Sequence, residues 1–250
     1  MRRMTIAALI ALALASWRVF AGEPDFPSIL AEIDEMASLE KVDFTATITI
    51  VSEKPGEDAG VMQARMFRRD RADLFCIVIL KPDAQKGQGY LQAEDSLWFY
   101  DPESRKFAHT SLKENFQDSN AKNSDLNESS LAKDYSIEKT EKGKLGSFET
   151  YIIDLKAVNN EVPYPHMRIW IRQDNYLVLK AEEYSLSERL MRTAYYPHYV
   201  KLEDRYFPDK MLFVDELKKG EKTQLSFTEL SIAPLPDSVF TKTYLERVNR

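Results

Sequence analysis

A hydrophobic period of two recurs in the chain from Phe44 to Ile232 and limits the possible folds more than any other sequence feature. In the first such segment, Phe44, Ile48 and Ile50 share one face of an extended strand, whereas threonines occupy the other face. Polar turns join the segments without long helices between them, which favours one antiparallel meander. We predict a sheet of about 10–11 strands, with candidates at 44–50, 61–69, 74–80, 89–93, 96–100, 136–142, 148–156, 167–172, 177–184, 190–199, 206–216 and 223–232.

Helical spacing precedes the strands, because Ile29, Ile33 and Met36 recur at the period of an amphipathic helix of about three to four turns. A polar segment, 110–133, interrupts the strands, and a loop of this length inside a compact domain is often functional. A second short helix is expected over 241–247. The apolar residues expected to anchor these last two segments are Phe116, Leu126, Leu131, Val239, Phe240, Tyr244 and Leu245.

Several strands carry apolar residues on both faces, as in 77–80, 97–100 and 211–214. A sheet packed only on itself needs one apolar face, so a second surface is covered. Ordinary helix packing explains any single strand, whereas a curved sheet around an apolar cavity explains the whole set. We therefore predict a mainly β fold with a few helices (α+β). Its core is an incomplete antiparallel β-barrel, or strongly curved sheet, with the first helix and the polar segment covering an apolar cavity.

The first 21 residues are predicted to be a cleaved signal peptide. Arg2 and Arg3 precede a 12-residue apolar run, 5–16, and residues 19–21 suit a signal peptidase. Twelve helical residues span about 18 Å, which is short of the roughly 30 Å hydrocarbon core and argues against a membrane anchor. We expect residues 22–250 to form a single domain in the periplasm.

Composition excludes several classes of function. The chain of 250 residues has a net charge of −6, and without its first 21 residues 31 Lys and Arg stand against 40 Asp and Glu. Such an acidic chain is a poor candidate for binding the phosphate backbone of a nucleic acid. The single cysteine, Cys76, permits no intramolecular disulfide and no multi-thiolate zinc site. Its apolar surroundings predict a buried, inert thiol.

The sequence contains no nucleophile elbow, zinc-protease motif, phosphate loop or dinucleotide fingerprint. Its three histidines, His109, His166 and His198, are widely separated and single out neither a base nor a metal site. The adjacent Glu182 and Glu183 are expected on opposite faces of a strand, so they form no facing carboxylate pair. We expect no enzymatic activity, no metal site and no cofactor.

Six segments, in their order along residues 28–248, carry a family resemblance. They are LKPDAQKGQGYL (80–91), SLWFYDP (96–102), SDL (124–126), DY (134–135), IWI (169–171) and DSVFT (237–241). In this order they resemble the LolA/LolB superfamily, specifically its LolA-like outer membrane lipoprotein-sorting proteins. The resemblance implies an incomplete antiparallel β-barrel whose helices close a cavity for acyl chains, without catalysis or a cofactor. The family's better-known carrier closes its lid with an arginine, for which Arg65 and Arg68 are nearby candidates.

Strand parity selects the residues that we expect to contact ligand or lid. They are Phe44, Ile48, Ile50, Met62, Met66, Trp98, Tyr100 and Trp170. Plain core packing is the alternative for each of them, since large apolar residues usually lie inside a protein whatever its function. A sixteen-carbon chain would gain on the order of 10 kcal/mol on leaving water for such a cavity.

Two classes of function follow. The first is a periplasmic carrier, or lipoprotein chaperone, that holds lipoprotein acyl chains or phospholipid and shuttles them toward the outer membrane. Its expected partners are an inner-membrane ABC-type transporter and an outer-membrane acceptor. The second is an RseB-like sensor that detects envelope lipids or lipoproteins and regulates a partner. A separate partner-binding domain would favour the sensor, and none is evident in the sequence. We expect a monomer.

Overall fold

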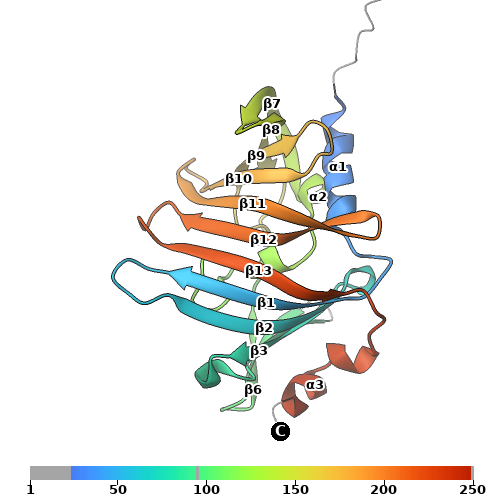
Figure 1. The fold of residues 1–250 in the computed structure, drawn as a ribbon, viewed down its shortest axis with the longest axis vertical. Helices are drawn as coiled ribbons and strands as arrows, with labels where there is room; N and C mark the ends of the chain where they lie inside the picture. The colour runs from blue at the N-terminus through green and yellow to red at the C-terminus, as the bar shows by residue number, and fades with distance from the viewer. Residues whose placement is uncertain (1–23, 94–95, 249–250) are drawn as a thin grey trace, which may run out of the picture.

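The computed structural model describes residues 24–93 and 96–248, so the signal peptide predicted over residues 1–21 lies outside the described residues. Thirteen antiparallel strands form one curved, unclosed sheet in the order β6-β5-β4-β3-β2-β1-β13-β12-β11-β10-β9-β8-β7 (Figure 1). The predicted mainly β fold with an incomplete antiparallel barrel is confirmed. The strands are β1 (Phe44–Glu53), β2 (Gly60–Arg69), β3 (Leu74–Lys81), β4 (Gly89–Ala93), β5 (Ser96–Asp101), β6 (Lys106–Thr110), β7 (Tyr135–Leu145), β8 (Phe148–Ala157), β9 (His166–Arg172), β10 (Val178–Tyr184), β11 (Leu190–Leu202), β12 (Arg205–Asp215) and β13 (Lys222–Ser231).

The sheet has thirteen strands rather than the predicted 10–11. All twelve candidate segments form strands, and β6 is the strand that the sequence pattern does not reveal. This edge strand, Lys106–Thr110, buries none of its side chains fully. Without a buried face it has no alternation of apolar and polar residues to detect.

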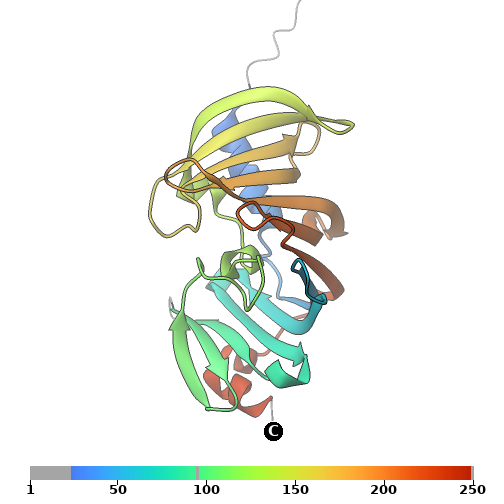
Figure 2. The ribbon, with the colours of Figure 1, turned by 90° about the vertical axis from the view of Figure 1, so that its left-hand side faces the viewer.

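The chain order explains why one long connection covers the sheet. Residues 44–110 form β1 to β6 as successive hairpins, and residues 135–231 form β7 to β13 in the same way. The two halves join where β1 pairs with β13, for example at Ile50 opposite Leu225. Strands β6 and β7 therefore lie at opposite edges of the sheet, and Figure 2 shows that these edges do not meet. The connection between them must cross the molecule.

This crossing connection, residues 111–134, is called the cover here. It includes the 3₁₀ turn η3 (Asn123–Leu126) and the short helix α2 (Leu131–Asp134). Phe116 and Leu126 are buried in the main apolar core, and Leu131 packs against that core. The expected anchoring of the polar segment by these residues is thus observed.

Helix α1 (Phe26–Ala37) lies beside α2 on the same side of the sheet (Figure 1). Asp25 caps its first turn, and its predicted apolar face buries Ile29, Leu30 and Ile33. At the start of the helix, Phe26 meets the ring of Tyr151 edge-on, with ring centroids 5.4 Å apart. The main core therefore lies between the concave face of the sheet and a layer made of α1 and the cover.

The convex face of β2 to β5 carries a second apolar cluster, which includes Cys76 and Tyr100. The C-terminal segment covers it with η4 (Asp237–Phe240) and α3 (Lys242–Arg247). The anchors expected here, Val239, Phe240, Tyr244 and Leu245, all pack into this cluster. Cys76 is buried, as predicted, and burial raises the pKa of its thiol well above the ordinary value.

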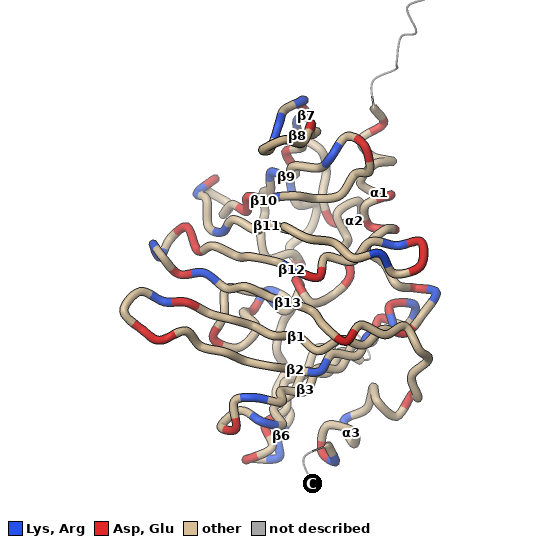
Figure 3. The backbone as a smooth tube through the Cα atoms, in the orientation of Figure 1, with Lys and Arg blue, Asp and Glu red and all other residues tan. Residues whose placement is uncertain are grey.

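Two coverings therefore account for β3 and β5, which are apolar on both faces. On β12 the outward Leu212 and Val214 are half-buried and belong to neither cluster. Charged residues lie mainly near turns and strand ends (Figure 3). Within residues 24–93 and 96–248, no helix has the length and apolar character needed to cross a membrane.

Candidate functional site

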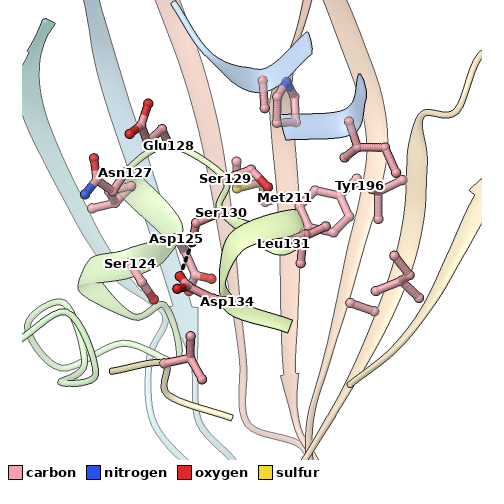
Figure 4. A pocket seen from close by; sticks show the side chains of 18 of the residues that line it. Ser124, Asp125, Asn127, Glu128, Ser129, Ser130, Leu131, Asp134, Tyr196 and Met211 are labelled. Carbon is pink, nitrogen blue, oxygen red and sulfur yellow. Dashed lines mark hydrogen bonds between the residues drawn. The ribbon is translucent and has the colours of Figure 1, made fainter. Parts of the chain in front are cut away.

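A cavity of about 610 Å³ lies between the concave face of the sheet and the layer formed by α1 and the cover. Figure 4 shows Leu131 of the cover together with Met211 and Tyr196 of the sheet around this space. Its volume falls in the range of small-molecule sites, about 300–1,000 Å³. Apolar residues from nearly every surrounding element line it, among them Ile33, Met36, Met66, Leu126, Leu131, Met167, Ile169, Val178, Ala181, Phe207, Met211 and Phe227.

Aliphatic and thioether side chains make this lining suitable for hydrocarbon. The thioethers of Met66, Met167 and Met211 come from three different strands, and such flexible side chains adapt to irregular ligands. Strand alternation places them inside, because successive side chains of a strand point to opposite faces.

The roof of the cavity is held by one carboxylate of α1. Asp34 accepts hydrogen bonds from the backbone N–H groups of Leu131 (2.9 Å) and Ala132 (2.7 Å), and from Ser129 Oγ (2.5 Å). These donors lie at the amino end of α2, where backbone N–H groups have no partner within the helix. One side chain thus joins the two helices that roof the cavity.

A buried ion cluster fixes the other end of the cover to the sheet. Arg192 of β11 pairs with Glu183 of β10, directly opposite it in the sheet, and with Asp125 of the cover. The guanidinium donates to Asp125 Oδ2 at 2.6 Å and Oδ1 at 2.9 Å, and to the carbonyl oxygen of Asn120 at 2.8 Å. Burial alone would lower the pKa of Arg192, but the two carboxylates raise it well above its ordinary value. Burial raises the pKa of Glu183 as well. The guanidinium therefore stays charged and holds the cover at Asp125 and Asn120.

The two arginines proposed as lid-closing candidates lie on opposite faces of β2. Arg68 faces the cavity, but it donates to Asp70 at the end of its own strand, at 2.6 and 3.0 Å. Arg65 lies outside and donates to Thr47 and Glu229. Neither is hydrogen-bonded to the cover, and the arginine that holds it is Arg192.

Six tyrosines also line the cavity: Tyr135, Tyr164, Tyr176, Tyr196, Tyr199 and Tyr206. The hydroxyl of Tyr135 donates to the carbonyl of Tyr164 at 2.9 Å, and that of Tyr199 donates to the carbonyl of Val178 at 2.7 Å. Burial raises the pKa of Tyr196, and the nearby carboxylates of Asp125 and Glu183 add to this effect. The Tyr196 hydroxyl therefore stays protonated and can donate a hydrogen bond.

The predicted ligand contacts are divided among three places. Met66 lines the cavity. Phe44, Ile48 and Ile50 are buried in the main core on the same face, and Met62 packs against that core, but none of these four lines the cavity.

The predicted aromatic contacts lie on the convex face. Trp98 and Tyr100 belong to the second apolar cluster, under the C-terminal segment. Trp170 lies on the outer face of β9, with Lys180 Nζ 4.3 Å from the ring centroid. Successive side chains of a strand point to opposite faces of the sheet. The adjacent residues Leu97, Phe99, Ile169 and Ile171 pack into the main core, so Trp98, Tyr100 and Trp170 point outward. Trp98, Tyr100 and Trp170 therefore lie outside the lining of the cavity.

Sequence reasoning missed Arg192, Glu183 and the tyrosines. The expectation that Glu182 and Glu183 lie on opposite faces is confirmed, since Glu182 bonds Lys180 and Tyr184 on the outer face. The carboxylate of Glu183 points inward and lies opposite Arg192 in the sheet. The sequence does not reveal this pair, because it depends on the register between β10 and β11. The sequence did contain one signal for this site, because Glu183 is a charged residue at a strand position whose side chain points into the core, and a buried charge needs a partner. Among the described residues, no group of three or more His, Cys, Asp and Glu side chains could hold a metal ion.

Comparisons with known proteins agree with this architecture. A family model described as "Uncharacterized protein" matches residues 71–247. A search of curated proteins finds no match.

Three solved structures have a similar fold over most of this chain. A LolA superfamily protein from Nitrosomonas europaea is 24% identical, with 87% of this chain and 97% of that chain covered and a TM-score of 0.75. A DUF1329 family protein from Desulfovibrio piger is 18% identical, with 88% and 97% covered and a TM-score of 0.78. A domain named for outer membrane lipoprotein sorting, from Vibrio parahaemolyticus, is 19% identical, with 87% and 97% covered and a TM-score of 0.76. The chain belongs to the family whose model matches residues 71–247, and its fold is that of the LolA superfamily, as the sequence segments predicted.

Proposed function

We propose that this protein is a periplasmic carrier that binds hydrocarbon chains of lipoproteins or lipids and shuttles them toward the outer membrane. The cavity of about 610 Å³ beneath the cover is the observation that supports this most directly. Each methylene that enters such a cavity from water contributes about 0.8 kcal/mol. A fully packed interior would offer no comparable site.

The contacts that hold the cover suggest how cargo enters and leaves. Asp34 and Arg192 attach the cover through hydrogen bonds, and Leu126 and Leu131 attach it through apolar packing. When the cover separates from the sheet, water replaces the partners of the Asp34 hydrogen bonds and of the buried Arg192–Asp125 ion pair, which offsets part of the cost of breaking these contacts. The apolar contacts are replaced by ligand when the cavity is filled.

We infer binding rather than catalysis as the role of the cavity. The solved structures with this fold include one named for lipoprotein sorting, which supports that reading. The signal sequence expected over residues 1–21 supports the periplasm as the location. The thirteen described strands form one sheet, which supports a single domain over 22–250 and favours a carrier over a sensor with a separate partner domain.

The proposal is tested by expressing the full chain in a bacterial envelope, purifying the processed protein and extracting it for mass spectrometry. We expect phospholipid or acylated protein to co-purify. In the variant Ala181→Trp, an indole replaces a methyl group in the cavity lining, so less lipid should be recovered. The control Ala108→Trp adds the same ring to an exposed position of β6 and should retain lipid.

Two results would contradict the carrier. One is a purified protein without lipid that also fails to bind added lipid. The other is equal lipid recovery from Ala181→Trp and Ala108→Trp, which would place the lipid outside the cavity.

A further inference from the structure

Exposed aliphatic side chains gather at one end of the sheet. Seven large apolar side chains are exposed in the described part of the chain, and five of them are Leu80, Val61, Leu217, Leu186 and Val158. They lie in or next to the β3–β4, β1–β2, β12–β13, β10–β11 and β8–β9 connections, in that order along the sheet. Alternate connections of an antiparallel meander lie at the same end, so these five form one rim, called the turn rim here.

The strand register supports this placement. Glu53 lies opposite Lys222, which brings the β1–β2 turn beside the β12–β13 turn. The backbone N–H of Glu216 donates to the carbonyl of Met191 at 3.0 Å, which ties the β12–β13 turn to the start of β11. Figure 1 shows the β1–β2, β12–β13 and β10–β11 turns at its left, and Figure 2 views the molecule from that side.

The opposite end of the sheet differs. Among the described residues it carries one exposed large apolar side chain, Phe148 of the β7–β8 hairpin. The seventh such residue, Val248, follows α3 and lies in no strand connection. A single exposed apolar side chain is ordinary on a protein surface. Five at one end against one at the other make the turn rim the apolar end of the sheet.

Leu186 is the most prominent of these side chains, at 80% exposed. Its turn is held by its own backbone, because the N–H of Ser185 donates to the carbonyl of Arg189 at 2.9 Å and the N–H of Glu188 donates to the carbonyl of Ser185 at 2.9 Å. The leucine therefore stays in water in the isolated protein. It gains free energy only by entering an apolar phase outside the fold.

The arrangement fits a lipid bilayer better than a protein partner. A protein interface has a contiguous, closely packed apolar core, whereas these side chains come from five separate connections. A fluid bilayer accepts isolated aliphatic side chains at any spacing. The five segments concerned span 54–61, 80–88, 158–165, 185–189 and 216–221. Together they hold six Lys and Arg against seven Asp and Glu, so no net positive charge draws this rim to acidic lipids.

The turn rim also meets the cavity. Val162 and Tyr164 of the β8–β9 connection line the cavity, and the exposed Val158 belongs to the same connection. We propose that the turn rim docks on the surface of a lipid bilayer by inserting its exposed aliphatic side chains, which brings this side of the cavity to the membrane. The inference goes beyond the proposed function, because docking does not depend on what the cavity holds.

Flotation of the processed protein with lipid vesicles tests this docking. The probes are vesicles of phosphatidylcholine with and without phosphatidylglycerol, each at low and at high salt. We expect the protein to bind both kinds of vesicle equally at both salt concentrations, because salt screens charges and not the insertion of uncharged side chains.

Matched variants locate the docking surface. Leu186→Ser and Leu217→Ser should each weaken vesicle binding by about tenfold, since each methylene that enters hydrocarbon contributes a factor of about four. The control Phe148→Ser removes a side chain that is as exposed as Leu217, 40% each, from the opposite end and should leave binding unchanged. Circular dichroism checks that all three variants fold.

A fluorescent label gives a second measurement that does not depend on affinity. Leu186→Cys can be labelled alone, because the natural cysteine, Cys76, is buried. An environment-sensitive fluorophore at this position should shift its emission to the blue when vesicles are added. The same label on Phe148→Cys should not respond.

The outcomes separate docking from the carrier function. Absence of vesicle binding by the wild-type protein, or equal binding by Leu186→Ser and Leu217→Ser, would overturn the docking surface and leave the carrier in place. Binding that requires phosphatidylglycerol and disappears at high salt would overturn aliphatic insertion. Cross-linking of the turn rim to a membrane protein without vesicle binding would assign the rim to that protein instead. A protein that docks but neither retains nor takes up lipid would contradict the carrier and leave the docking surface intact.

Discussion

Arg192 joins the hairpin formed by β10 and β11 to the cover, which lies 67–72 residues earlier in the chain. It bonds Glu183 of β10, Asp125 of η3 and the backbone of Asn120, and its side chain is only 4% exposed. Taking these charges out of water is expensive, and only their mutual contacts offset the cost. Removing Arg192 should therefore lower the free energy of unfolding more than removing a surface arginine whose hydrogen bonds are equally short.

We predict that Arg192→Ala lowers the free energy of unfolding by about 3–5 kcal/mol, because two buried carboxylates lose their counter-charge. Urea denaturation followed by circular dichroism measures this loss. The control is Arg168→Ala on the outer face, where the side chain is 31% exposed and pairs with Asp154 at 2.7 Å. It should cost at most about 1 kcal/mol. Equal losses in the two variants would contradict the assigned role of Arg192.

A second buried ion pair makes stability depend on pH. Hydrogen bonds from Arg69 lower the pKa of Asp43 from 3.8 to about 2, helped by the backbone N–H of Leu235 and by Arg71. Because the folded pKa is depressed, this contribution is fully present above about pH 4 and is lost as the pH falls toward 2.

We therefore expect the wild-type protein to be more stable than Asp43→Asn at pH 6, and this difference to shrink by on the order of 2 kcal/mol between pH 4 and pH 2. Denaturant titrations of both proteins at pH 6, 4 and 2 measure the effect. A difference that stays constant over this range would show that Asp43 does not titrate as proposed.

At the scale of elements, the roof depends on a contact between two helices rather than on either helix alone. Helix α2 has only four residues, too few to be stable in isolation. Asp34 of α1 bonds the first N–H groups of α2, and the apolar side of α1 packs on the sheet. The stability of the roof should therefore follow the Asp34 contact.

We predict that Asp34→Ala accelerates backbone hydrogen exchange over residues 129–134 and speeds ligand release, with a loss of about 1 kcal/mol in stability, typical of a lost helix cap. Exchange measured by mass spectrometry, with a fluorescent lipid chased from the protein, gives both readouts. Glu32→Ala, an exposed carboxylate on the same helix, is the control and should change neither. Unaltered exchange in Asp34→Ala would refute this account of the roof.

At the scale of the whole molecule, the sheet separates two apolar clusters that lie on its opposite faces. The concave cluster surrounds the cavity, whereas the convex cluster is covered by α3. The close approach of α3 needs Gly89, where an added Cβ would lie 2.7 Å from Leu245 Cδ2 and 2.6 Å from the carbonyl oxygen of Ile77. Leu245 itself is fully buried.

We predict that Leu245→Ala destabilises the protein by about 2–5 kcal/mol through loss of packing, without changing affinity for lipid. The thiol of Cys76, which belongs to the same apolar cluster, should become reactive toward a thiol reagent such as Ellman's reagent, whereas we expect it to be inert in the wild-type protein. Val248→Ala, 41% exposed, is the control and should leave the thiol protected. A matching loss of lipid affinity in Leu245→Ala would show that the two clusters are coupled.

The strands, the first helix and the anchors of the cover could be predicted because each depends on local periodicity. Ile29 and Ile33 repeat at helical spacing, and Phe44 and Ile48 repeat at strand spacing, whatever the rest of the chain does. The sequence also predicted that a second face of the sheet is covered, because several strands carry apolar residues on both faces. The site residues were harder, and Met66 alone of the predicted ligand contacts lines the cavity.

The sequence by itself determined a mainly β chain with one leading helix, a long polar connection and two apolar faces to cover, because alternation and composition act over a few residues at a time. Only the tertiary structure decided which face encloses a cavity, and it placed Trp98 and Tyr100 outside and Tyr196 and Tyr199 of β11 inside. Sheet curvature, register and the path from β6 to β7 set those positions. They bring together residues such as Asp125 and Arg192, whose separation along the chain leaves no local pattern to read.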